Sequence, residues 1–166
     1  MTQLATDPLT LIHLAISLAA IVTGLMALAA MLKGRTPVTL TGVFLTLTVL
    51  TSVTGFLFHN DHVTPGQIVG AVSLVVLAVA LFAIYGRRLA GHWRTAYVVT
   101  AVAALYLNVF VLVIQSFIKI PALHALVPAI PPAGPVFGGV QGVVLVAFIF
   151  AGWLAVKAGH SAAATA

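Results

Sequence analysis

One long apolar run, Ala96–Ile120, constrains the fold of this chain more than any other stretch. Leu, Val, Ile and Phe fill most of it, and as a helix it is long enough to cross about 30 Å of hydrocarbon. Three strongly polar residues interrupt it, and at about 100° per residue they fall within roughly 20° of one line along a helix: Asn108, Gln115 and Lys119. This pattern predicts a membrane helix with one face packed against protein.

The composition of the whole chain excludes a water-soluble fold. Of its 166 residues, 62% are hydrophobic and 5% are charged, and the mean hydropathy is +1.22. A soluble domain carries about 25% charged residues, so the chain belongs to the class of integral membrane proteins. Cysteine is absent, which excludes disulfides, thiolate metal sites and cysteine nucleophiles.

Four further apolar runs complete an all-α bundle of five spans, in a single transmembrane domain. The predicted spans cover about residues 9–32, 38–58, 66–85, 95–120 and 136–156. The first run lacks the basic n-region and the short apolar core of a signal peptide, so we expect it to be retained. The proline-rich segment between the last two spans favours an extended loop, in which Ala122–Leu126 could form a short interfacial turn. The alternative is a four-span protein whose glycine-rich fifth segment lies flat on the membrane.

The basic residues predict the orientation of the bundle. With five alternating spans, six of the seven Lys and Arg residues fall on one side, and only Lys119 falls on the other. The positive-inside rule then places the N-terminus outside and the C-terminus in the cytoplasm. Both Trp residues lie near the inner boundary, as expected for an aromatic belt.

Small residues mark faces on which helices can approach closely. Gly66-x-x-x-Gly70 opens the third span, and Gly138-x-x-x-Gly142 opens the fifth. On the second span, small and hydroxyl residues recur at helical spacing: Thr41, Thr48, Ser52 and Gly55. Such faces serve packing within the bundle, a homo-oligomer, or contact with another membrane protein.

Polar side chains collect on the predicted outer side. His13 lies one turn into the first span, and ionisable residues at membrane depth usually face a bundle interior or a water-filled cavity. Three glutamines come from other spans at a similar depth, and His124 belongs to the same side: Gln67, Gln115 and Gln141. Together these residues predict a polar vestibule open to the periplasm.

The candidate metal ligands are His13, His59, Asp61 and His62. His59 and His62 are three residues apart and can share one face of a helix end. Imidazoles with a carboxylate suit zinc or copper(II). Haem b, held by two histidines from facing helices, fits only near the outer surface because no His lies mid-membrane. The alternative is that these are solvated loop histidines.

The line of Asn108, Gln115 and Lys119 has two interpretations. One is an interhelical hydrogen-bond clamp, and the other is a polar path in a small transporter. A pump usually needs a carboxylate at mid-depth, but both Asp residues lie outside the spans and Glu is absent. No acid pair, nucleophile elbow or phosphate-binding glycine loop supports an enzyme. We therefore expect a non-catalytic accessory or ligand-binding protein, with a metal- or haem-binding redox protein and a transporter as alternatives.

Several stretches resemble a known family. The most specific are ALYLNVFVLV (Ala104–Val113) and KIPAL (Lys119–Leu123), and LAGHWRTAYV (Leu89–Val98) and LTSVTGFLF (Leu50–Phe58) extend the likeness over most of the chain. They resemble a family of small uncharacterised proteobacterial membrane proteins, and the first two spans are more loosely similar to the DUF2306 type. The resemblance implies a bacterial inner-membrane location and implies no activity.

Overall fold

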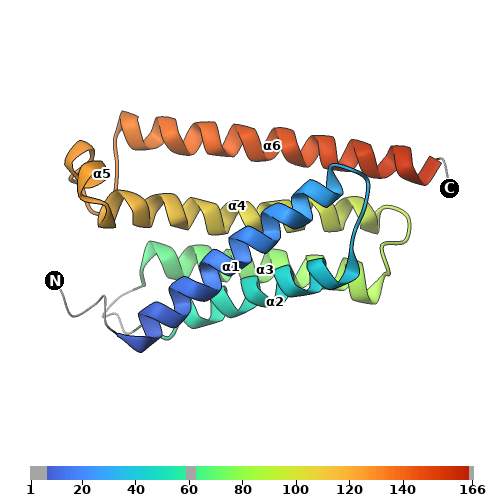
Figure 1. The fold of residues 1–166 in the computed structure, drawn as a ribbon, viewed down its shortest axis with the longest axis horizontal. Coiled ribbons are helices and arrows are strands. Elements are labelled where there is room, and N and C mark those ends of the chain that lie inside the picture. Colours follow the sequence, from blue (N-terminus) through green and yellow to red (C-terminus); the bar gives the residue numbers. More distant parts are fainter. Residues whose placement is uncertain (1–6, 59–62, 165–166) are drawn as a thin grey trace.

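The structure, a computed structural model, describes residues 7–58 and 63–164 (Figure 1). Five of its helices are long and apolar enough to cross a membrane. They are α1 (Pro8–Met31), α2 (Val38–Gly55), α3 (Pro65–Leu81), α4 (Trp93–Lys119) and α6 (Pro135–Ala164). The predicted all-α fold with five spans is therefore confirmed.

Proline marks the start of four of the helices. Pro8, Pro65, Pro121 and Pro135 are each the first residue of their helix, a position where the missing N–H costs no hydrogen bond. Asp7 and Thr64 precede two of them and cap the exposed backbone: Asp7 Oδ2 accepts from Thr10 N at 3.3 Å, and Thr64 Oγ1 accepts from Gln67 N at 3.3 Å.

The ends of α2 and α6 differ by several residues from the predicted bounds, and the last turn of the third span is π-helical. A π-helical turn, η1 (Phe82–Gly86), continues α3, and α2 stops at Gly55 rather than at residue 58. The predicted interfacial turn is the short helix α5 (Pro121–Leu126). α6 runs well beyond residue 156 because its last residues include alanines, which are the strongest helix formers.

Helices α1 to α4 pack into a bundle, and α6 lies beside it (Figure 1). α1 packs mainly on α2, and α3 packs mainly on α4. α6 runs alongside α4 and makes a smaller contact with α1. The fifth apolar segment is therefore a full-length helix parallel to the bundle, and it is the least buried of the five.

Gly24 allows α1 to approach its neighbours closely. A Cβ at this position would lie 2.5 Å from Leu105 Cδ1 on α4 and 2.7 Å from Phe44 Cε2 on α2. Both neighbours are almost fully buried in the main hydrophobic core, together with Leu45, Leu77 and Tyr97. The core at the crossing of α1, α2 and α4 therefore depends on this glycine.

The hydroxyl face of α2 is buried. The exposed fractions of Thr41, Thr48 and Ser52 are 0%, 0% and 5%. Thr48 and Ser52 donate to carbonyls one turn earlier in their own helix, at 2.8 and 3.0 Å, whereas Thr41 accepts from the hydroxyl of Tyr97 on α4 at 3.4 Å. The face thus packs closely against the bundle.

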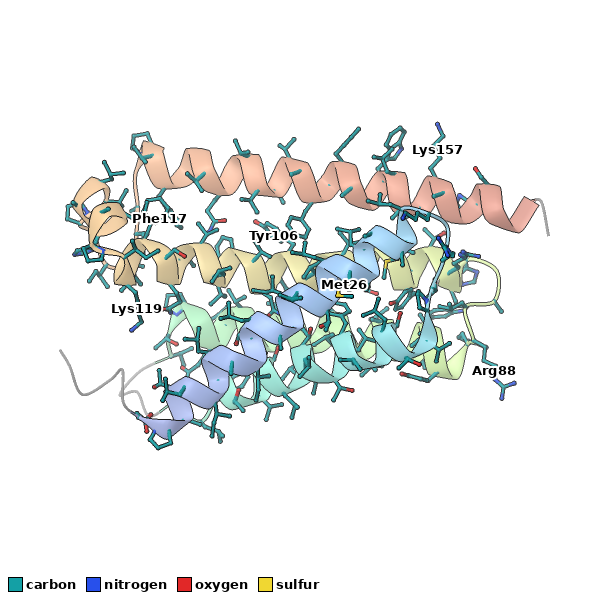
Figure 2. The ribbon with its side chains drawn as sticks, viewed as in Figure 1. Met26, Arg88, Tyr106, Phe117, Lys119 and Lys157 are labelled. Atoms are coloured by element: carbon teal, nitrogen blue, oxygen red, sulfur yellow. The ribbon has the colours of Figure 1, made fainter. Side chains whose placement is uncertain are left out.

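The two ends of the bundle differ in charge (Figure 2). Lys119 lies at the end that carries α5, which we call the α5 end. Arg88 and Lys157 lie at the opposite end. The loops and helix ends there hold six cations, and we call it the basic end: Lys33, Arg35, Arg87, Arg88, Arg94 and Lys157.

Candidate functional site

His13 lies half-buried where α1 meets the end of α2. Its Nδ1 is 2.8 Å from Thr54 Oγ1, and its ring contacts the Phe58 ring edge-on, with centroids 5.2 Å apart. A Cβ on Gly55 would lie 3.7 Å from the imidazole. Neighbouring residues on α2 therefore position the ring.

The hydrogen bonds around Thr54 assign the tautomer of His13. Thr54 Oγ1 lies 2.8 Å from the Leu50 carbonyl oxygen and donates its single hydrogen there. It can then only accept from His13, so Nδ1 of the neutral ring carries the hydrogen. Nε2 keeps its lone pair and is the ring atom suited to bind a metal ion. A histidine ligand is typically oriented in this way through its other nitrogen.

The other three predicted metal ligands, His59, Asp61 and His62, lie outside the described residues. Within residues 7–58 and 63–164, no group of three or more His, Asp or Glu side chains could hold a metal ion. The metal site at His13 therefore stays a prediction.

The three glutamines of the predicted vestibule have different neighbours. Gln67 turns back on its own helix, where its Oε1 accepts from Thr64 N at 3.0 Å. Gln141 on α6 is buried and donates from Nε2 to the Phe110 carbonyl on α4 at 3.1 Å. Gln115 is exposed on α4. Gln67 therefore bonds at the start of α3, and Gln141 bonds to α4. The vestibule stays a prediction.

His124 lies half-buried on α5, and its Nδ1 is a buried atom with no partner among the described residues. It lies in α5, and among the described residues the hydrogen bonds of Gln67 and Gln141 go to other partners.

The predicted clamp residues become more exposed along α4. Asn108 is half-buried, whereas Gln115 and Lys119 are exposed. The amide nitrogen of Asn108 is buried and lacks a hydrogen-bond partner in the described part of the chain. The residues that share its face nearer the basic end, Tyr97, Ala101 and Ala104, are fully buried in the core. The clamp, like the polar path, remains a hypothesis.

Arg94 links three segments at the basic end. Its guanidinium donates to the carbonyl of Gly34 in the loop between α1 and α2. A Cβ on Gly159 of α6 would lie 3.1 Å from Arg94 Nε, so α6 also packs against this side chain. Beside it, Thr95 Oγ1 is 3.1 Å from His160 Nε2. The sequence indicated only the charge of Arg94 and not this link, which joins residues 60 positions apart.

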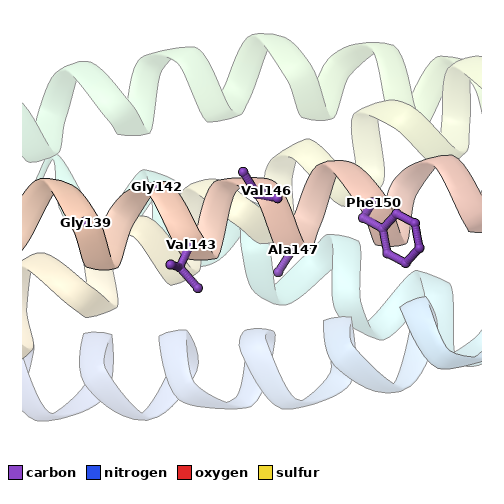
Figure 3. A pocket seen from close by; sticks show the side chains of 6 residues that line it. All are labelled: Gly139, Gly142, Val143, Val146, Ala147 and Phe150. Atoms are coloured by element: carbon purple, nitrogen blue, oxygen red, sulfur yellow. The ribbon is translucent and has the colours of Figure 1, made fainter.

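The outer face of α6 is open and apolar (Figure 3). A shallow hollow runs along it between residues spaced three or four apart: Gly139, Gly142, Val143, Val146, Ala147 and Phe150. Apart from the adjoining residues and the nearby backbone of α6 itself, no atom of the described residues lies within 4 Å of a Cβ built at Gly138, Gly139 or Gly142. By contrast, a Cβ on Gly70 of α3 would meet the Phe56 ring at 3.4 Å and the Ser52 carbonyl at 3.6 Å. Of the two Gly-x-x-x-Gly motifs, the one on α3 therefore packs against another helix of the described structure through Gly70, whereas the one on α6 does not.

Comparison of the sequence with family models and with curated proteins, and of the fold with solved structures, gave no match. The class of this protein therefore rests on its fold. Five long apolar helices define a multi-pass integral membrane protein, whose apolar outer surface suits contact with a lipid bilayer.

Proposed function

We propose that this chain is a non-catalytic accessory protein of the bacterial inner membrane, and that it associates with a second copy of itself through the outer face of α6. The observation that carries the proposal is the set of open glycines on that face. Three described histidines that could bind a ligand or transfer a proton lie on different helices: His13 on α1, His124 on α5 and His160 on α6.

Open glycines inside a helix have a cost that the described fold does not offset. A glycine destabilises a helix by about 1 kcal/mol relative to alanine. Gly24 and Gly70 offset this cost by letting neighbouring helices approach, whereas Gly139 and Gly142 have no such neighbour in the described chain. Small residues at this spacing let two membrane helices pack backbone to backbone, which supports a partner helix on α6.

The chemistry of the face favours an identical partner. It contains no charge and no polar side chain, so an apolar helix fits it. It also combines recesses at Gly139 and Gly142 with projecting side chains at Val143, Val146 and Phe150. A two-fold contact places the same patch on both partners, so the projections of one copy can fill the recesses of the other.

Cysteine cross-linking in native membranes tests the proposal, since the chain has no cysteine of its own. Val143→Cys should form a disulfide-linked dimer under mild oxidation. Val75→Cys on α3 is the matched control, because the exposed fractions of Val143 and Val75 are 72% and 68%. Gly139→Leu and Gly142→Leu, each combined with Val143→Cys, should abolish the cross-link.

Two results would reject the α6 interface. Equal cross-linking at Val143 and Val75 would indicate random collisions. A Val143→Cys protein that stays monomeric, or that links only to a different protein, would exclude a second copy as the occupant of the face.

A metal site at His13 is the second candidate function, and the tautomer of that ring favours it. The Thr54 contact presents Nε2 as the free ligand atom, and His59, Asp61 and His62 follow soon after Phe58 in the sequence. Calorimetric titration with zinc and with copper(II) should show binding that His13→Ala weakens strongly and that His160→Ala, at the basic end, leaves unchanged. If the wild-type protein binds no more tightly than His13→Ala, His13 is not a ligand.

A further inference from the structure

We infer that the basic end is a binding surface for anionic phospholipid headgroups, centred on Arg87 and the two aromatic rings beneath it. This inference does not depend on the α6 interface or on which side of the membrane the basic end faces.

Among the described residues, no Asp or Glu side chain lies at the basic end. Six of the seven Lys and Arg residues of the sequence lie there. Asp7 directly precedes α1 at the α5 end, and Asp61, the other acidic residue of the sequence, lies outside the described residues. No acidic side chain of the described residues neutralises these cations, which leaves them open to anionic groups from outside the chain. Lys and Arg near a membrane surface attract anionic lipids.

Five of the six cations are available for such a contact. Arg94 is occupied, because it bonds to the Gly34 carbonyl and packs against Gly159. The others are exposed: Lys33, Arg35, Arg87, Arg88 and Lys157. Arg94 holds the loop between α1 and α2 against α4 and α6, so it brings Lys33 and Arg35 to the same end as the other cations.

Two cations are held in place by aromatic rings. The guanidinium carbon of Arg87 lies 5.4 Å from the Trp93 ring centre and 5.6 Å from that of Phe82. The two rings meet edge to face, with centroids 5.1 Å apart. Lys157 Nζ lies 5.3 Å from the Trp153 ring. The faces of these rings stabilise the charges, and the N–H groups of Arg87 remain suited to a bidentate contact with phosphate.

The backbone between η1 and α4 is shaped to present this surface. Arg88 and Leu89 have φ values of 49° and 57°, a conformation that residues with side chains seldom adopt. The Leu89 N–H donates to the Ala83 carbonyl at 3.0 Å and closes the turn. The turn returns the chain so that Trp93 lies next to Phe82, and Arg88 projects away from the bundle (Figure 2). Strained backbone of this kind is often retained at binding sites.

A membrane lipid is the source of phosphate that fits this surface. Tryptophan rings of membrane proteins concentrate at the level of the headgroups, and both tryptophans of this chain lie beside a cation at the basic end. A lipid at that level can contact a ring with its acyl chain and a cation with its phosphate.

The two tryptophans also provide the test. The full-length protein is reconstituted in bilayer nanodiscs that contain phosphatidylglycerol or phosphatidylcholine with brominated acyl chains, which quench tryptophan fluorescence on contact. Brominated phosphatidylglycerol should quench more strongly at low salt. The preference should vanish in about 1 M salt, where the Debye length falls to about 3 Å. Arg87→Gln and Arg88→Gln should each lower the preference about two- to fivefold, whereas Lys119→Gln, at the α5 end, should not.

The ratio of quenching by the two lipids corrects for any change that Arg87→Gln makes to Trp93 itself. Arg88→Gln is the second variant, because the cations stacked on the two tryptophan rings in the described structure are Arg87 and Lys157. Equal quenching by the two lipids would overturn the inference. A preference that survives both arginine substitutions would place the lipid elsewhere and overturn it as well. If millimolar inorganic phosphate removes the preference, the surface binds a free anion and not a lipid.

Discussion

Gly24 and Gly138 are both helical glycines, but they differ in what surrounds them. A Cβ at Gly24 would collide with Leu105 and Phe44, whereas one at Gly138 would have open space around it within the described chain. Gly24→Ala should therefore lower the free energy of unfolding in detergent by about 1–3 kcal/mol, the usual cost of overpacking a core, and so lower the melting temperature.

Gly138→Ala is the matched substitution and should raise thermal stability slightly, because alanine favours the helix by about 1 kcal/mol. Equal melting temperatures for the two variants would show that α1 does not approach α2 and α4 as closely as the structure has it.

Asn108 provides a second test at the scale of a residue. Its amide nitrogen is buried without a partner among the described residues, and an unpaired buried donor costs about 1–3 kcal/mol. Asn108→Leu should therefore leave the melting temperature unchanged or raise it relative to Val109→Leu, a neighbouring control. The clamp hypothesis requires the opposite result, a clear fall in the melting temperature for Asn108→Leu alone.

Among the structural elements, the contact between the basic-end loops and α6 depends on Arg94. Arg94→Gln removes a charged donor from the Gly34 carbonyl, and hydrogen bonds that involve a charged group contribute about 1.5–3 kcal/mol. Arg94→Gln should lower the melting temperature in detergent, whereas Arg88→Gln, which removes an exposed cation two residues beyond η1, should not. Equal effects of the two substitutions would mean that only the overall charge matters.

Sequence patterns predicted the number and placement of the long helices well. Apolar runs of sufficient length and prolines at helix starts specify them, and both are local features. The same patterns did not identify Gly24 as a close crossing, or Thr54 as the partner of His13, because each depends on which faces of distant segments meet. The two Gly-x-x-x-Gly motifs look alike in sequence, and only the packing separates Gly70 from Gly142.

At the scale of the whole molecule, the candidate site was harder to predict than the fold. Depth along a helix can be counted from the sequence, and the helix bounds put Gln67, Gln115 and Gln141 nearer the α5 end than the basic end. Direction around the helix decides whether they converge, and this depends on tertiary contacts. Gln67 bonds within its own helix start, and Gln141 bonds to α4. The position of a residue along its helix does not predict either of these bonds.

We predict that the five-span bundle has its basic end in the cytoplasm, and cysteine labelling in intact bacteria tests both the spans and this orientation. Val63 and Ala90 flank α3 and η1 at opposite ends, both are exposed, and the chain has no other cysteine. With a membrane-impermeant maleimide, Val63→Cys should be labelled in intact cells, and Ala90→Cys should be labelled only after the membrane is permeabilised. Labelling of Ala90→Cys in intact cells, with Val63→Cys protected, would contradict the orientation, and labelling of both would contradict the spanning bundle itself.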